Sequence, residues 1–204
     1  FALPSTITHQ VLFKAVRTAV PIGNETPTNC GLPSDPWPIR RAAVNKIMPN
    51  TIFHRLRGKR VFVTGHTGFK GSWLCLWLHR LGAIVSGYSL DPPTRPSLFD
   101  VARVGDTLVA DKRADIADLV QLTKAIEESR AEVIFHLAAQ AIVREGYRDP
   151  ITTHATNVLG TANVLEAARR LPSLKALVSI TTDKCYENRE WVHPYREPDR
   201  LGGD

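Results

Sequence analysis

The sequence lacks several features, and each absence argues against a class of protein. No apolar run approaches the roughly 18–20 residues that a membrane-spanning helix needs, which argues against an integral membrane protein. The cysteines are few and scattered, at Cys30, Cys75 and Cys185, with neither a CxxC pair nor a metal-ligand spacing. We therefore interpret them as reduced thiols of a cytoplasmic protein, expect no metal site, and assign Cys185 to packing rather than to catalysis.

A basic stripe interleaved with aromatic residues is also missing. The formal net charge is +6, but residues 1–47 alone contribute +3 of it. Half of the excess charge therefore lies outside the part of the chain that has the pattern of a folded domain. We expect no nucleic-acid partner.

The first 47 residues differ in composition from the rest. They contain six prolines and no sustained periodicity, apart from a short amphipathic helical pattern at residues 8–20, and the single methionine is Met48. We interpret residues 1–47 as a disordered or foreign leader and residues 48–204 as one domain. A targeting peptide is the alternative, although the segment has neither an apolar secretory core nor a strong arginine periodicity.

From residue 59 onward, strand and helix patterns alternate. The expected strands are 59–64, 83–88, 107–110, 132–136 and 175–181. The expected helices are 70–81, 116–130 and 150–170, the last from the apolar repeat Ile151, Ala155, Val158, Ala162 and Leu165. The proline-rich stretch 91–106 is expected to be an irregular crossover. Right-handed crossovers then predict an α/β fold, a doubly wound parallel sheet with strand order 3-2-1-4-5.

A turn with three glycines joins the first strand to the first helix. It reads Gly65-His66-Thr67-Gly68-Phe69-Lys70-Gly71. In a dinucleotide-binding (Rossmann) fold one glycine allows the tight turn, one lets the backbone approach the pyrophosphate, and one allows close helix–strand packing. The pattern is GxxGxxG rather than GxGxxG, so by itself it leaves open a strand–helix turn that binds nothing.

Two further segments favour a dinucleotide site. Asp115-Ile116 follows a strand-like stretch, where a carboxylate can accept the adenine amino group beside an apolar contact. Leu137-Ala138-Ala139 follows the fourth strand, and its small residues would let a ribose and a nicotinamide approach. Taken in this order, the three segments predict a cofactor site at the carboxyl edge of the sheet.

Five motifs resemble the extended short-chain dehydrogenase/reductase family, and within it the nucleotide-sugar 4,6-dehydratases. They are GHTGFKG, DIAD (115–118), HLAAQ (136–140), NVLGT (157–161) and TTDK (181–184), and the likeness runs from about residue 58 to residue 204. The resemblance implies a bound NAD. The cofactor-binding residues that we expect are Gly65, His66, Thr67, Gly68, Phe69, Lys70, Gly71, Ser89, Asp115, Ile116, Leu137, Ala138, Ala139, Gln140 and Asn157.

The same resemblance implies a catalytic trio and a reaction. Thr182 would hydrogen-bond the C4 hydroxyl of a nucleotide sugar, and Asp183 would protonate the departing C6 hydroxyl. Lys184 would remove the C5 proton, which requires a lowered pKa, or would stabilise enolate charge. The product would be a 4-keto-6-deoxy sugar nucleotide for surface polysaccharide, made by a full-length enzyme that is a homo-oligomer.

Several points stay open. Ser89 ends the second strand where many NAD enzymes have an acid, so the residues alone do not exclude NADP, although the family favours NAD. Asn157 can support the catalytic pair or be a surface residue, and Lys70 can touch phosphate or point to solvent.

The family's YxxxK pair is missing, since neither Tyr186 nor Tyr195 is followed four residues later by lysine. We therefore expect a C-terminally truncated and inactive fragment that lacks the last strands and the substrate domain. A nucleotide-sugar epimerase and a non-catalytic dinucleotide-binding module are the alternatives.

Overall fold

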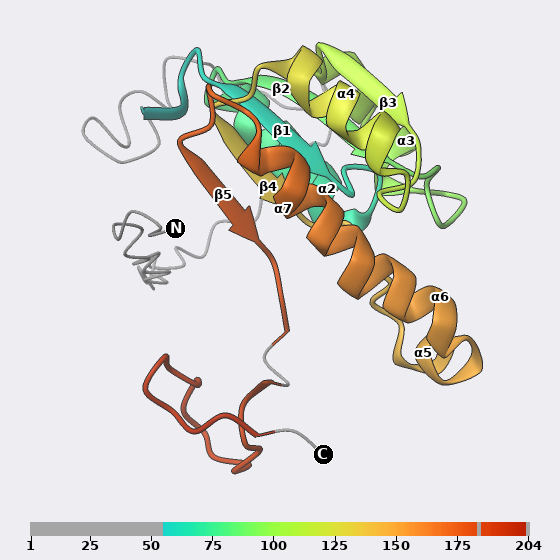
Figure 1. Ribbon diagram of the computed structural model, residues 1–204, viewed down its shortest axis with the longest axis vertical. Helices are drawn as coiled ribbons and strands as arrows, with labels where there is room; N and C mark the ends of the chain where they lie inside the picture. The colour runs from blue at the N-terminus through green and yellow to red at the C-terminus, as the bar shows by residue number, and fades with distance from the viewer. Residues whose placement is uncertain (1–54, 183–184, 203–204) are drawn as a thin grey trace, which may run out of the picture. The chain divides into compact units, whose positions relative to one another are not determined.

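The computed structural model describes residues 55–182 and 185–202, and these form a five-stranded sheet with helices on both faces (Figure 1). The strands are β1 (Arg60–Thr64), β2 (Ile84–Ser89), β3 (Ala110–Arg113), β4 (Val133–His136) and β5 (Ala176–Ser179). All pairings are parallel and the order is β3-β2-β1-β4-β5. The predicted doubly wound sheet is confirmed.

Each face of the sheet has its own core. Helices α2 (Phe69–Arg80) and α3 (Leu98–Val101), with the 3₁₀ turn η2 (Val104–Thr107), cover one face, and α4 (Leu119–Ser129) and α7 (Thr161–Arg169) cover the other. Side chains alternate between the two faces along β1, which explains why the central strands are apolar throughout.

The third strand begins where we expected it to end. Residues 104–107 form η2, and β3 runs over Ala110–Arg113, so the predicted strand 107–110 is wrong by three residues. Val104 is buried against the α2 core, whereas Val109 is 67% exposed. β3 is an edge strand held by backbone bonds to β2, and so its polar sequence carries no burial signal.

Two short helices were not predicted. α3 lies inside the stretch 91–106 that we expected to be irregular, and Ser97 caps it by accepting a hydrogen bond from the backbone N–H of Asp100 at 3.0 Å. α5 (Val143–Arg148) follows β4. Helices of four to six residues are too short to show a periodic apolar pattern.

The helix expected over 150–170 exists, but its interior and its buried face differ from the expectation. It consists of α6 (Pro150–His154), a π-helical segment η3 (Ala155–Gly160) and α7. The apolar repeat used to predict it faces outward, with Ile151, Val158 and Leu165 at least half exposed. Gly160 is buried instead, and there is no room for a side chain there, because a Cβ would lie 2.5 Å from Cδ1 of Ile116.

The other predicted elements agree with the structure to within one or two residues, except at the start of α4. That helix was expected from Ile116 but begins at Leu119, because the Asp118 side chain caps it by accepting from the backbone N–H of Gln121 at 3.0 Å. No helix in the described part of the chain is long and apolar enough to span a bilayer. The predicted leader, residues 1–47, lies outside the described residues.

Candidate functional site

The glycine loop between β1 and α2 leaves no room for side chains at two positions. Gly65 has a φ of +74°, and a Cβ there would lie 2.7 Å from the backbone nitrogen of Ala138 in the loop after β4. At Gly71 a Cβ would overlap the Gly65 carbonyl. These close approaches bring the ends of β1 and β4 and the start of α2 together.

The start of α2 has the properties of an anion site. Gly68 is its N-cap and forms no side-chain cap, and the first turn contains no acidic residue. The N–H groups of such a turn have no partner within the helix and lie at the positive end of the helix dipole. Phe69 and Lys70 are exposed there, so a phosphate would meet backbone donors and a cation.

The His66 side chain points into the core. Its imidazole is fully buried against Gly87 and makes a T-shaped contact with the Phe99 ring, and Nε2 lies 2.8 Å from Oδ1 of Asp111. Burial lowers the pKa of His66, an effect that the carboxylate of Asp111 only partly offsets. We infer that a neutral imidazole donates to Asp111, so any contact of His66 with a cofactor would come from its backbone.

Thr67 connects the glycine loop to the end of β2. Its hydroxyl donates to the Leu90 carbonyl at 2.9 Å and lies 2.8 Å from the Ser89 hydroxyl. Because Thr67 has one hydroxyl proton and the carbonyl must accept it, Ser89 donates to Thr67. The Ser89 hydroxyl therefore has no proton left to donate to another group.

Charged residues gather where β3 ends. Nε and Nη2 of Arg113 bond both carboxylate oxygens of Asp111, at 2.7 and 2.8 Å, and Nη1 lies 3.4 Å from Asp91. The guanidinium also lies over the Phe99 ring, 4.6 Å from its centroid. Burial favours a higher pKa for Asp111, but bonds from Arg113 and His66 outweigh it and the pKa is lowered.

Neutral groups form a hydrogen-bond chain where β1 and β4 end. The Thr161 hydroxyl donates to the Asn157 carbonyl at 2.8 Å, so it accepts from Nε2 of His136 at 2.9 Å. Burial lowers the pKa of His136, and its unprotonated Nδ1 accepts from Thr64 at 2.7 Å. The Thr64 oxygen in turn accepts the backbone N–H of Ala138 at 3.2 Å. One proton arrangement satisfies every bond in this chain.

Asn157 holds the segment after β4 in place. Its side-chain oxygen accepts the backbone N–H of Gln140 at 2.8 Å, and its amide donates to the Gln140 carbonyl at 2.9 Å. The alternative of an asparagine that only faces solvent does not fit these two bonds. The expected segment Leu137-Ala138-Ala139 lies just before, at the carboxyl end of β4, with Ala139 exposed.

The two residues that we expected to contact the adenine, Asp115 and Ile116, differ in their exposure to solvent. Asp115 is exposed, and its Oδ1 accepts the backbone N–H of Ala117 at 2.9 Å. Ile116 is only 3% exposed because it packs in the core beneath α7 and against Gly160. The structure therefore places the Ile116 side chain in the core, whereas the Asp115 carboxylate keeps a free edge.

Of the expected catalytic trio, only Thr182 is described, and it is exposed. Asp183 and Lys184 lie outside the described residues. The chain beyond them forms a closed loop, in which Tyr186 and Leu201 form an antiparallel bridge and the rings of Tyr186 and Tyr195 stack 5.2 Å apart.

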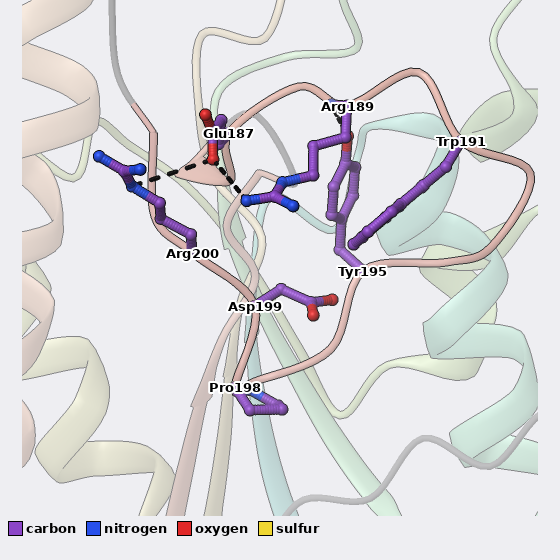
Figure 2. Close-up of a pocket in the computed structure, with 7 residues that line it drawn as sticks. All are labelled: Glu187, Arg189, Trp191, Tyr195, Pro198, Asp199 and Arg200. Atoms are coloured by element: carbon purple, nitrogen blue, oxygen red, sulfur yellow. Dashed lines mark hydrogen bonds and ion pairs between the residues drawn. The ribbon is translucent and has the colours of Figure 1, made fainter.

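Figure 2 shows the hollow inside this loop, about 270 Å³ in volume. Trp191 and Tyr195 form one wall of it. Arg189 and Arg200 approach the Glu187 carboxylate from two sides, at 3.1 and 3.9 Å. The pocket is therefore shaped by contacts within the loop itself.

Sequence reasoning missed the residues that support the site. In the sequence, His136 and Thr161 are only members of motifs and Thr64 only the end of the first expected strand, and Asp111 and Arg113 were not considered. A histidine at the end of the apolar strand VIFH is one signal that was available, because a buried polar side chain needs a partner. The Asp111–Arg113 pair gave no such signal, since β3 itself was misplaced.

Comparisons with known proteins agree with this geometry. Residues 62–201 match the family model described as GDP-mannose 4,6 dehydratase. A CDP-glucose 4,6-dehydratase of Salmonella typhimurium is 55% identical over 147 residues, 72% of this chain and 41% of the relative. A UDP-glucose 4-epimerase of Mycolicibacterium smegmatis is 40% identical over 110 residues, which are 54% of this chain and 34% of the relative.

A solved structure is also similar. The crystal structure of UDP-glucose 4-epimerase from Brucella ovis in complex with NAD has a TM-score of 0.59 and 25% identity, and covers 70% of this chain and 41% of that one. The chain thus spans less than half the length of these relatives.

The finer resemblance rests on four segments of the sequence. GHTGFKGSW, GYSLDPPTRPSLF, HLAAQAIVREGYRDP and TTDKCYEN are similar to CDP-glucose 4,6-dehydratase in particular. The 55% identity to the Salmonella enzyme confirms that resemblance. The family model covers more than half of the chain, and the chain therefore belongs to the GDP-mannose 4,6-dehydratase family.

Proposed function

We propose that the complete protein dehydrates CDP-glucose to CDP-4-keto-6-deoxyglucose with NAD, and that this chain supplies its dinucleotide-binding domain. The observation that carries the proposal is the glycine loop, in which Gly65 and Gly71 leave no space for side chains beside an uncapped, acid-free helix start. The 55% identity to a CDP-glucose 4,6-dehydratase supports the choice of substrate.

The residues fit NAD. A pyrophosphate would bind the backbone N–H groups of Phe69 and Lys70, an adenine would meet the Asp115 carboxylate, and the nicotinamide ribose would lie beside Ala138 and Ala139. NAD, when bound, would accept a hydride and later return it. Asn157 would hold the backbone at Gln140 so that the site is formed before the cofactor arrives.

The trio would carry the chemistry on the sugar. Thr182 would hydrogen-bond the C4 hydroxyl, and Asp183 would donate the proton that lets the C6 hydroxyl leave as water. A positioned acid contributes about 10²–10⁴-fold, and it must be protonated when it acts. Lys184 would remove the C5 proton if it is neutral, or else stabilise the enolate that forms.

Further properties belong to the complete protein. We place it in the cytoplasm, as a homo-oligomer in the synthesis of surface polysaccharide such as lipopolysaccharide, with neither nucleic acid nor membrane as a partner. The support is the family resemblance. The 204-residue chain itself is expected to be inactive, because none of its tyrosines is followed four residues later by lysine.

The test uses the complete protein with CDP-glucose deuterated at C4. A dehydratase gives a product that has lost one water and carries the deuterium at C6, as mass spectrometry can show. Asp183→Asn should abolish water loss. A product of unchanged mass that has an inverted C4 centre would instead establish the epimerase that two of the relatives suggest, and an epimerase should survive Asp183→Asn.

A further inference from the structure

The ends of β2 and β3 contain two opposite signals for the choice between NAD and NADP. In doubly wound folds an acid near the end of the second strand accepts the ribose 2′-hydroxyl of NAD, whereas a nearby arginine accommodates the 2′-phosphate of NADP. Here Ser89 ends β2, Asp91 follows it, and Arg113 ends β3 directly opposite Ser89 in the sheet register. Asp91 therefore predicts NAD, whereas Arg113 predicts NADP.

The contacts of Arg113 decide between them. Three of its N–H groups point at carboxylates, two at Asp111 and one at Asp91, and its planar face is covered by the Phe99 ring. One positive charge is thus shared between two negative ones. A phosphate that approached would meet a guanidinium whose charge is already neutralised, next to the excess negative charge of Asp91, whose side chain is 89% exposed.

Asp111 cannot easily release Arg113. It also accepts a hydrogen bond from the buried His66 at 2.8 Å, so its position is tied to the core beneath the glycine loop. Moving Arg113 toward a ligand would break a bidentate pair, which is among the stronger ion-pair geometries. The arginine is therefore part of the framework rather than a waiting phosphate ligand.

The hydrogen bonds of Ser89 also argue against a 2′-phosphate. Its hydroxyl proton is donated to Thr67, because Thr67 gives its own proton to the Leu90 carbonyl. The Ser89 oxygen can accept from a ribose hydroxyl but has no proton to give to a phosphate oxygen. Ser89, which is only 9% exposed, thus has no proton to donate, and the exposed Asp91 can only accept.

From these contacts we infer that Asp91, Arg113 and Asp111 form a specificity filter that selects the dinucleotide without a 2′-phosphate, with Asp91 as its exposed, discriminating residue. The inference rests on the proposed function and makes it more specific. It answers the question that Ser89 left open in the sequence.

The experiment measures the dissociation constants of NAD⁺ and NADP⁺ by titration calorimetry on the complete protein, at low salt. The parent should bind NAD⁺ at least about tenfold more tightly than NADP⁺. Asp91→Asn should strengthen NADP⁺ binding about tenfold and leave NAD⁺ within about threefold, and added salt should shrink the gain. Asp106→Asn is the control, since it removes an exposed carboxylate that pairs with Arg103 and not with Arg113, and it should change neither constant.

The outcomes separate the two proposals. An unchanged NADP⁺/NAD⁺ ratio in Asp91→Asn would overturn the filter and leave the proposed NAD-dependent dehydration standing. Tighter NADP⁺ than NAD⁺ binding by the parent would overturn both the filter and the choice of NAD, whereas the dehydration of CDP-glucose keeps its own test with the deuterated substrate. If the parent binds neither nucleotide, the proposed function fails and the filter fails with it.

Discussion

The two sides of the glycine loop are built from different chemistry. On the β4 side, neutral groups form a buried hydrogen-bond chain from Thr64 through His136 to Thr161. On the β3 side, the neutral His66 imidazole donates to Asp111, Asp111 pairs with Arg113, and Arg113 also contacts the exposed Asp91. The neutral chain has one proton arrangement and little contact with solvent, so it acts as a scaffold. The charged side remains open to ions, which suits it to discrimination between ligands.

The largest effect, a loss of NAD affinity, is expected for a substitution in the glycine loop that lies between the two sides. Gly65→Ala would place a Cβ against Ala138 at a φ of +74°, so the loop must move and NAD affinity should fall more than about a hundredfold. Gly58→Ala is the control, because its φ is +71° and nothing lies within 4 Å of the added Cβ. Calorimetric titration and denaturant unfolding of both variants would isolate the clash from the strain. Equal effects of the two substitutions would contradict the close-approach argument.

The next effect concerns the neutral chain. Thr161→Val keeps the shape but leaves the Nε2–H of His136 and the Asn157 carbonyl without their partner, and should lower the free energy of unfolding by about 1–3 kcal/mol. Urea unfolding measures it. Thr107→Val, which loses one hydrogen bond to the Val104 carbonyl in η2, should cost about 1 kcal/mol or less. If Thr161→Val lowers the free energy of unfolding no more than the control does, the buried hydrogen-bond chain contributes little to stability.

A pH effect follows from the buried histidines. Burial lowers the pKa values of His136 and His66 below the ordinary 6.5, so the unfolded chain takes up protons first as pH falls. Their neutral forms therefore stabilise the fold fully above pH 6.5, and that stability declines as pH falls below it toward the folded values.

Denaturant unfolding between about pH 7.5 and about pH 5.5 checks this effect, a range that lies above the carboxylate titrations. His136→Gln should flatten the decline, because it removes one of the two buried imidazoles. An identical slope in the parent and in His136→Gln would show that His136 does not contribute to it.

The smallest effect tests the charged side. Asp91→Ala should change the free energy of unfolding by less than about 0.5 kcal/mol, because an exposed ion pair at 3.4 Å contributes little in water. The same measurement at high salt should remove even that difference. If Asp91→Ala lowers the free energy of unfolding as much as Thr161→Val does, the charged side is as important for stability as the buried neutral side, and the comparison fails.

Much of the fold was predictable from local pattern. The central strands are apolar on both faces, and strand and helix patterns alternate, so the strand order followed. β3 was misplaced because an edge strand is held by its backbone and not by apolar side chains. The outward-facing repeat at Ile151 was misread because periodicity shows that a helix has an apolar face but does not say what covers it.

Part of the candidate site was equally readable. The sequence by itself determined the glycine loop, the order of the motifs and the family, because those depend on residue types at fixed spacings. Only the tertiary structure decided that the His66 ring belongs to the core, that Ser89 gives its proton to Thr67, and that Arg113 is held between two carboxylates. These are contacts between residues as far as 45 positions apart, and hydrogen-bond direction and charge neutralisation exist only once the chain has brought the partners within reach.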